Sequence, residues 1–195
     1  GGIANTIKRY NLSDLSYVDA SPNYGSTIFA LTISGDYIYA GGANTIKRYN
    51  LSDLSYVDTS PNYGGTINAI AISGDYIYAG GDGGTIKRYN LSDLSYVDAS
   101  PSYGGNIYAL AIYGDYIYAG GRTTNTIRRY NLSDLSYVTQ SPSYGERIYA
   151  IAISGNYIYA GGIANTIKRY NLSDLSYVDA SPNYGGNIRV LAISG

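Results

Sequence analysis

Carboxylates and basic side chains are the main groups in this chain that could take part in acid–base or ligand chemistry. The sequence contains no histidine and no cysteine, so nucleophile–base pairs and imidazole or thiolate metal sites cannot be assembled. Aspartate recurs, and one aspartate of each repeat lies in the same Leu-Ser-Asp-Leu-Ser segment, where capping of a turn explains it. Glu146 is the only glutamate and has no evident partner. We therefore expect a protein that is not an enzyme and uses no cofactor and no metal. The turn aspartates are Asp14, Asp53, Asp93, Asp134 and Asp174.

Basic residues occur as one adjacent pair in each repeat, as in Lys47-Arg48. The formal net charge is -1, which excludes a basic footprint for nucleic acid or an anionic membrane. Successive residues of a strand lie on opposite faces, so we expect these pairs to stack on tyrosine or pair with aspartate. No stretch approaches the roughly 20 apolar residues that span a bilayer, and we expect no membrane insertion.

A short modification motif recurs beside the turn aspartates. Asn11-Leu12-Ser13 fits the N-glycosylation pattern, and the same three residues recur in every repeat. Together with the absence of cysteine, methionine and tryptophan, the motif favours a secreted or cell-surface protein, with a cytoplasmic protein as the alternative. The candidate acceptors are Asn11, Asn50, Asn90, Asn131 and Asn171.

The elements that position these residues repeat along the whole chain. The segment Tyr-Asn-Leu-Ser-Asp-Leu-Ser-Tyr-Val occurs five times, at steps of 39, 40, 41 and 40 residues. A period near 40 is typical of repeat architectures in which each unit packs on its neighbours. We expect one domain over residues 1–195, whose units are 1–40, 41–79, 80–119, 120–160 and 161–195.

One unit reads as four short strands. In the third unit, alternating and β-rich residues predict strands over 106–112, 115–119, 126–131 and from 136 to one or two residues beyond 138. Tight turns join these segments, and none has helical periodicity. The expected fold class is therefore all-β: a β-propeller of five repeats of about 40 residues, with four-stranded antiparallel blades. A β-solenoid is the competing architecture.

The best-repeated stretch also carries a family resemblance. Asp-Tyr-Ile-Tyr-Ala-Gly-Gly ends at Gly81, Tyr89 follows eight residues later, and Tyr96 comes after six intervening residues. This pattern resembles a kelch repeat, with Tyr96 at the place of the kelch tryptophan. It also resembles a WD40 repeat, with Tyr89-Asn90 in place of Trp-Asp, although the Gly-His pair is missing. Both resemblances imply a propeller that serves as a binding scaffold.

The last unit lacks its second strand, about Asp-Tyr-Ile-Tyr-Ala. The chain begins at Gly1 within a repeat and without methionine, which indicates a processed or trimmed start, and it stops at Gly195. Three interpretations remain open. The chain is part of a longer protein, the closing blade has three strands, or a strand of another molecule fills the gap and produces self-association.

Differences between the repeats collect in two loops. In an antiparallel meander, the loop between the second and third strands and the loop before the first strand lie at the same end of the strands, which we call the variable face. Divergence there indicates ligand recognition by a non-enzymatic module, for a protein or carbohydrate ligand; tolerance of loops to change is the alternative explanation. A structural subunit of a surface layer or filament, joined through blade edges, and an intracellular interaction scaffold are the alternative functions. The equivalent candidates are Phe29, Asn68, Tyr108, Tyr149 and Arg189, and we expect Asp82, Arg122, Glu146 and Arg147 around them.

Overall fold

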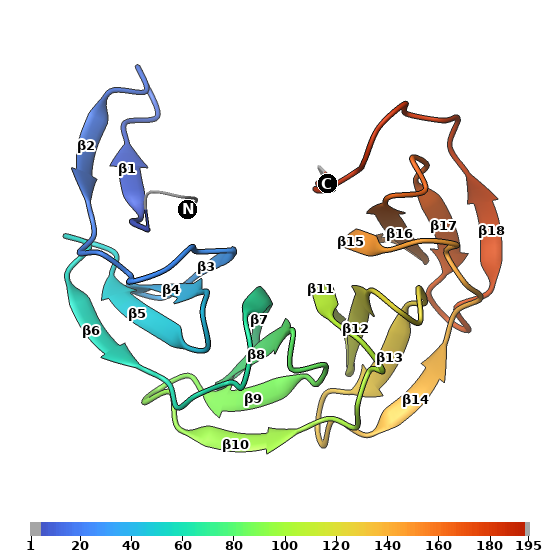
Figure 1. Cartoon of the computed structure of the whole chain (residues 1–195), viewed down its shortest axis with the longest axis horizontal. Coiled ribbons are helices and arrows are strands. Elements are labelled where there is room, and N and C mark those ends of the chain that lie inside the picture. Colours follow the sequence, from blue (N-terminus) through green and yellow to red (C-terminus); the bar gives the residue numbers. More distant parts are fainter. Residues whose placement is uncertain (1–4, 194–195) are drawn as a thin grey trace. The chain divides into compact units, whose positions relative to one another are not determined.

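The computed structural model describes residues 5–193, which fold into short β-strands joined by turns and loops (Figure 1). The strands form one two-stranded sheet and four four-stranded sheets. The first sheet contains β1 (Lys8–Tyr10) and β2 (Tyr17–Ala20). The second contains β3 (Ala30–Ser34), β4 (Tyr37–Gly41), β5 (Ile46–Asn50) and β6 (Tyr56–Thr59). The third contains β7 (Ile67–Ser73), β8 (Tyr76–Gly81), β9 (Lys87–Asn90) and β10 (Tyr96–Ala99). The fourth contains β11 (Ile107–Tyr113), β12 (Tyr116–Gly121), β13 (Arg128–Asn131) and β14 (Tyr137–Gln140). The fifth contains β15 (Ile148–Ser154), β16 (Tyr157–Gly162), β17 (Lys168–Asn171) and β18 (Tyr177–Ala180).

Each four-stranded sheet is an antiparallel meander in which the strands lie in chain order. The strand prediction for the third unit is confirmed, because β11 to β14 match the predicted segments to within two residues. Register follows the alternation of the sequence: Ile117 of β12 lies opposite Ile112 of β11 on one side and Tyr130 of β13 on the other. Alternating β-branched and aromatic residues therefore set both the strands and their pairing.

The prediction of a β-propeller is wrong. The five sheets are separate, and none of them is closed or propeller-like. Within residues 5–193 the strand ladders run inside the meanders, apart from an isolated bridge between Ala43 and Thr66, and the amino-terminal sheet has two strands, not four. At the other end of the described chain, residues 187–193 form no strand. Short turns join successive strands of a meander, so their main-chain hydrogen bonds are exchanged inside one sheet, and this is the physical reason that the sheets are separate. Gly1 and Gly195, on which the predictions about the ends of the chain rest, lie outside the described residues.

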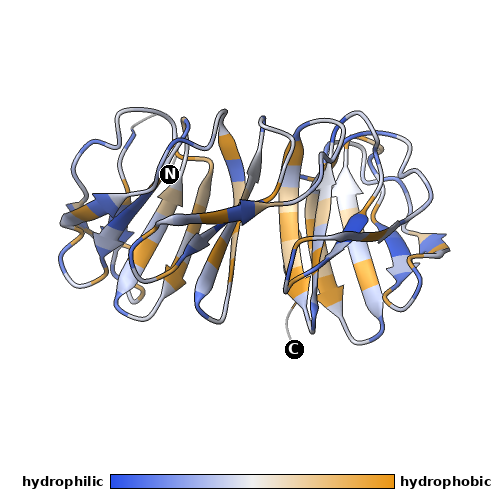
Figure 2. Ribbon diagram, turned by 90° about the horizontal axis from the view of Figure 1, so that it is seen from below, coloured by the Kyte–Doolittle hydropathy of each residue, from blue (hydrophilic) through white to orange (hydrophobic). Residues whose placement is uncertain are grey.

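Two compact units make up the chain, and each is described by itself. Unit 1 comprises Gly1–Ala79 and Lys87–Asp98, and unit 2 comprises Gly80–Ile86 and Ala99–Gly195. In both units apolar residues concentrate along the strands, while many loop residues are hydrophilic (Figure 2). The core of each unit therefore lies between neighbouring sheets.

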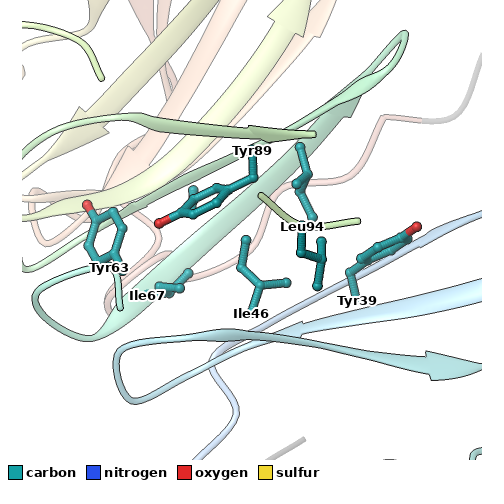
Figure 3. Packing of buried hydrophobic residues seen from close by; sticks show 8 residues of the cluster. Tyr39, Ile46, Tyr63, Ile67, Tyr89 and Leu94 are labelled. Carbon is teal, nitrogen blue, oxygen red and sulfur yellow. The ribbon is translucent and has the colours of Figure 1, made fainter. Parts of the chain in front are cut away.

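Buried tyrosines and aliphatic residues fill the space between sheets in unit 1. Figure 3 shows Tyr39 and Ile46 of the second sheet facing Tyr89 and Leu94 of the third, and all four are at most 1% exposed. Unit 2 repeats this packing: Tyr118 and Ile127 lie in one buried cluster with equivalent residues of the next sheet. Each interface between sheets thus pairs a leading face, made by the second and third strands of one repeat, with a trailing face of the following repeat. The trailing residues in unit 2 are Tyr170 and Leu175.

Close approach of two strands explains the glycine that ends each second strand. A Cβ atom added to Gly41 in β4 would lie 2.7 Å from Cγ2 of Ile67 in the next sheet. In unit 2, a Cβ atom added to the equivalent Gly120 would lie 2.7 Å from Cγ2 of Ile148. The sheets pack so closely at these points that only a residue without a side chain fits.

Candidate functional site

Three of the predicted variable-face residues meet in unit 2. The rings of Tyr108 and Tyr149 lie with their centroids 5.3 Å apart at an angle of 55°. The guanidinium carbon of Arg189 lies over the Tyr149 ring, 5.3 Å from its centroid. Both tyrosines are half-buried, while Arg189 is exposed. The second residues of β11 and β15, together with Arg189 at the equivalent position of the next repeat, therefore bring two aromatic faces and one cation together, as the equivalence of their positions predicts.

The loops around this cluster carry the other charged candidates. Nδ2 of Asn106, just before β11, donates to Oδ1 of Asp82 at 2.8 Å and joins the two variable loops of one repeat. Arg122 and Glu146 are exposed, and Arg147 is half-buried two residues before Tyr149. Charged groups of both signs thus flank the aromatic pair, with arginine in excess.

The two remaining candidates lie in unit 1. Phe29 is 57% exposed just before β3, and Asn68 is half-buried in β7. Both residues thus belong to unit 1, whereas Tyr108, Tyr149 and Arg189 belong to unit 2.

Grooves at the opposite end of the sheets are the concave features that sequence reasoning missed. In unit 2 a groove of about 760 Å³ lies between the fourth and fifth sheets, and in unit 1 a similar groove of about 740 Å³ lies between the second and third. The sequence contained a signal for these grooves. The tyrosine pair of the second strand and the arginine of the third strand recur with the same spacing from repeat to repeat. The unit 2 groove is lined by Tyr113, Gly114, Asp115, Tyr116, Tyr118, Arg129, Asn156, Tyr157, Asn171, Leu172 and Ser173.

The arginine in each groove is already engaged in holding two repeats together. In unit 1, Arg48 stacks over the Tyr37 ring at 4.9 Å and forms a bidentate ion pair with Asp58. Its Nη1 donates to the main-chain oxygens of Leu91 and Ser92 in the next repeat, at 3.2 and 2.8 Å. Both interactions predicted for the Lys-Arg pairs are confirmed here, and they give this arginine a structural role.

Unit 2 contains an exception to this arrangement. Arg129 stacks over Tyr116 at 4.8 Å and donates to the oxygens of Leu172 and Ser173. Thr139 stands where the other repeats have aspartate, and the buried Nε of Arg129 has no hydrogen-bond partner among the described residues.

The turn aspartates have the structural role that the sequence predicts. Oδ1 of Asp53 accepts hydrogen bonds from the main-chain N–H and the hydroxyl of Ser55, at 2.9 and 2.7 Å. These bonds lower the pKa of the Asp53 carboxyl. Within residues 5–193 no group of three or more carboxylates could hold a metal ion. The same described part contains no helix long and apolar enough to cross a membrane.

The asparagine of each glycosylation motif also takes part in the turn. Nδ2 of Asn50, the atom that would carry a glycan, donates to Oγ of Ser55 at 2.7 Å. Asn90, Asn131 and Asn171 make the same bond at 2.8 Å. Closure of the turn therefore explains these residues without a modification, and glycosylation stays a prediction.

Comparisons with known proteins bear on the fold alone. No protein-family model matches the chain, and no curated protein matches it. Among solved structures it is similar to the computationally designed Ika8 protein, with a TM-score of 0.83 and 16% identity over 99% of this chain. The chain spans 61% of the length of that protein. It is also similar to the computationally designed Ika4 protein, with a TM-score of 0.70 and 18% identity, over 78% of this chain and 95% of that one. The chain is thus an all-β repeat protein whose sheets resemble those of designed proteins, and no kelch or WD40 family is confirmed.

Proposed function

We propose that the protein is a non-enzymatic recognition module that binds an acidic carbohydrate at the variable face of unit 2. The observation that carries this proposal is the stacked group of Tyr108, Tyr149 and Arg189. Each residue occupies the equivalent position of a different repeat, so the group is assembled by the fold and not by one continuous segment.

The chemistry of the group suits a sugar that carries a carboxylate. A pyranose ring offers an apolar face that packs on tyrosine, and the phenolic hydroxyls can exchange hydrogen bonds with the sugar hydroxyls. The Arg189 guanidinium, held over Tyr149, is oriented to pair with a carboxylate through two parallel bonds. Side chains with few rotatable bonds bind at a small cost in conformational entropy, which favours tyrosine in such sites.

Divergence between the repeats supports recognition at this face. Phenylalanine and asparagine stand at the equivalent positions 29 and 68, whereas the groove tyrosines and arginines repeat without the same variety. We place the protein outside the cell or on its surface, and intact mass spectrometry tests the glycan part of that placement. A mass equal to the polypeptide alone would remove it.

Calorimetric titration with an oligomer of galacturonic acid, compared with a neutral oligosaccharide of the same length, tests the function. We expect saturable binding of the acidic oligomer only. Tyr108→Ala and Tyr149→Ala remove the stacking surface and should weaken binding at least tenfold, and Arg189→Gln should abolish the preference for the acidic oligomer. Tyr113→Ala, in the groove at the other end of the sheets, is the matched control and should bind normally. Unchanged affinity in both tyrosine variants, with folding verified by circular dichroism, would refute the proposal.

A further inference from the structure

The first sheet of unit 1 has a bare trailing face. Tyr10 is 48% exposed and Leu15 is 73% exposed, whereas their equivalents in the second sheet, Tyr49 and Leu54, are each 1% exposed. Tyr49 and Leu54 are buried in a cluster with Ile7 of the preceding sheet. The first sheet therefore exposes the surface that the second sheet buries against the first and the fifth sheet buries against the fourth.

The last sheet of unit 2 has a bare leading face. A hollow of about 330 Å³ lies on it, lined by residues that include Tyr159, Ile167 and Arg169. These residues are equivalent to Tyr39, Ile46 and Arg48, which cover the next repeat in unit 1. Arg169 keeps its ion pair with Asp179, but its Nη1 has no carbonyl acceptor within residues 5–193.

An exposed tyrosine lies beyond the same sheet. Tyr184 is 75% exposed, while its equivalents Tyr103 and Tyr144 are fully buried. The main-chain N–H of Tyr184 donates to the oxygen of Asn165, so the residue is anchored to the last sheet as its equivalents are to theirs. Within residues 5–193 no further repeat covers this ring, whereas the ring of the equivalent Tyr24 packs beside Tyr49 of the following repeat.

The two bare faces are complementary because the chain contains the same interface internally. Arg9 donates to the oxygens of Leu51 and Ser52, at 3.0 and 2.8 Å, as Arg48 and Arg129 do in the following repeats. In the same arrangement, the acceptors for Nη1 of Arg169 would be the main-chain oxygens of Leu12 and Ser13, which are equivalent to those of Leu51 and Ser52. The leading-face residues Tyr159 and Ile167 would likewise pack on the trailing-face residues Tyr10 and Leu15, as the equivalent Tyr39 and Ile46 pack on Tyr89 and Leu94.

We propose that the partner of each face is a second copy of this chain. The leading face of one copy, with Arg169 and Tyr184, packs on the trailing face of the next copy, with Tyr10 and Leu15. The interface is heterologous, so a copy bound at one face still offers the other, and association continues until the ends meet or a filament forms. This inference goes beyond the proposed function and shares no residue with it.

Complementation between two variants tests the proposal by sedimentation velocity. Tyr184→Asp disables the leading face and Leu15→Asp disables the trailing face. Both side chains are exposed, so the variants should fold. Each variant alone should sediment as one chain of 20.9 kDa, and an equal mixture should form a dimer and nothing larger, since only one pair of intact faces remains. Tyr113→Asp, which changes an exposed tyrosine of neither face, should assemble like the unaltered chain.

Three results would overturn the proposal: an unaltered chain that is monomeric at every concentration, variants that assemble like it, or a mixture that stays monomeric. Arg169→Gln gives a second measure, because it leaves the apolar contact in place and removes two carbonyl bonds. It should weaken association about tenfold or more, as expected for the loss of charge-assisted hydrogen bonds.

Discussion

Tyrosine supplies much of the buried surface of this protein, and its hydroxyl has to be accommodated at each position. Tyr103 is fully buried, and its hydroxyl donates to the main-chain oxygen of Thr126 at 2.7 Å. Tyr170 is equally buried, but its hydroxyl has no hydrogen-bond partner among the residues described. The same side chain is therefore a satisfied polar group in one place and an unsatisfied one in another.

This difference predicts opposite results for one substitution. Tyr103→Phe should lower the free energy of unfolding by about 1–2 kcal/mol, because it breaks a buried hydrogen bond and leaves the Thr126 oxygen unpaired. Tyr170→Phe should change it by less than about 0.5 kcal/mol or raise it, because only an unpaired hydroxyl is lost. Urea denaturation of the two variants gives both values. An equal loss in the two variants would contradict this account of the buried hydroxyls.

The arginine of unit 2 that lacks a carboxylate makes a second prediction at this scale. Thr139→Asp would restore to Arg129 the partner that Arg48 has in Asp58. The free energy of unfolding should rise by about 1 kcal/mol, because a buried Nε gains an acceptor in a partly solvated setting. Thermal unfolding of this variant and of Thr139→Asn, which offers a neutral acceptor, measures the gain. A lower melting temperature for Thr139→Asp than for the unaltered chain would show that the Nε is satisfied in another way.

At certain glycines of the second strands, the neighbouring sheet lies so close that no side chain fits. Gly120→Ala in β12 would place a Cβ 2.7 Å from Ile148, and we expect a loss of about 1–3 kcal/mol from overpacking. Gly186→Ala is the matched control, since a Cβ there meets nothing within 4 Å, and its stability should change little. Differential scanning calorimetry of both variants compares them, and a loss of the same size at Gly186 would refute the packing argument.

At the scale of elements, the sequence predicted the strands and the order of the meander well. Alternating residues, glycine pairs and constant turns act over a few residues, and β11 to β14 follow from them. The turn between the third and fourth strands was predicted from its serine and aspartate residues. Nothing in the sequence indicated that Leu54 in this turn, which is 1% exposed, adopts a left-handed backbone conformation with φ of 58°. Leu15 adopts the same conformation, at φ 56°, although it is 73% exposed, so core packing does not hold this backbone. The hydrogen bond from the Leu54 N–H to the Asn50 oxygen, at 2.9 Å, has the same counterpart at Leu15 and stabilises the turn in both places.

The candidate site was predicted in part. Equivalence of positions found Tyr108, Tyr149 and Arg189, because residues at the same place in successive repeats lie side by side. The grooves were missed because they are formed between repeats, largely by residues that recur in every repeat and so show no divergence. The closed propeller was wrong for a related reason. Local patterns specify a single sheet, whereas closure depends on contacts between elements far apart in the chain, and the first sheet, β1 and β2, has only two strands.

Burial of many tyrosines makes the stability of the whole molecule sensitive to alkaline pH. Burial, followed by the nearby Tyr24 and Tyr56, raises the pKa of Tyr49 to about 12, and burial also raises the pKa of Tyr89 and Tyr170. Stability is fully present below the unfolded pKa of about 10 and is lost as the pH rises through the folded pKa, because only the unfolded chain ionises in between.

The free energy of unfolding should therefore fall steeply between about pH 10 and pH 12. Tyrosinate absorbance of the buried rings should rise together with loss of the β-sheet signal, because these rings ionise only when the chain unfolds. A single gradual titration with intact sheets up to pH 12 would contradict the link between burial and stability.

The central claim about the whole molecule is that one interface, repeated between its sheets, is also presented at its two ends. The most direct measurement is sedimentation velocity of the unaltered chain over a wide range of concentration at low and moderate salt. We expect species larger than 20.9 kDa, whose size and fraction of the total protein increase with concentration. The fraction of these species should be lower in Leu15→Asp. A single species of 20.9 kDa at every concentration would contradict the claim.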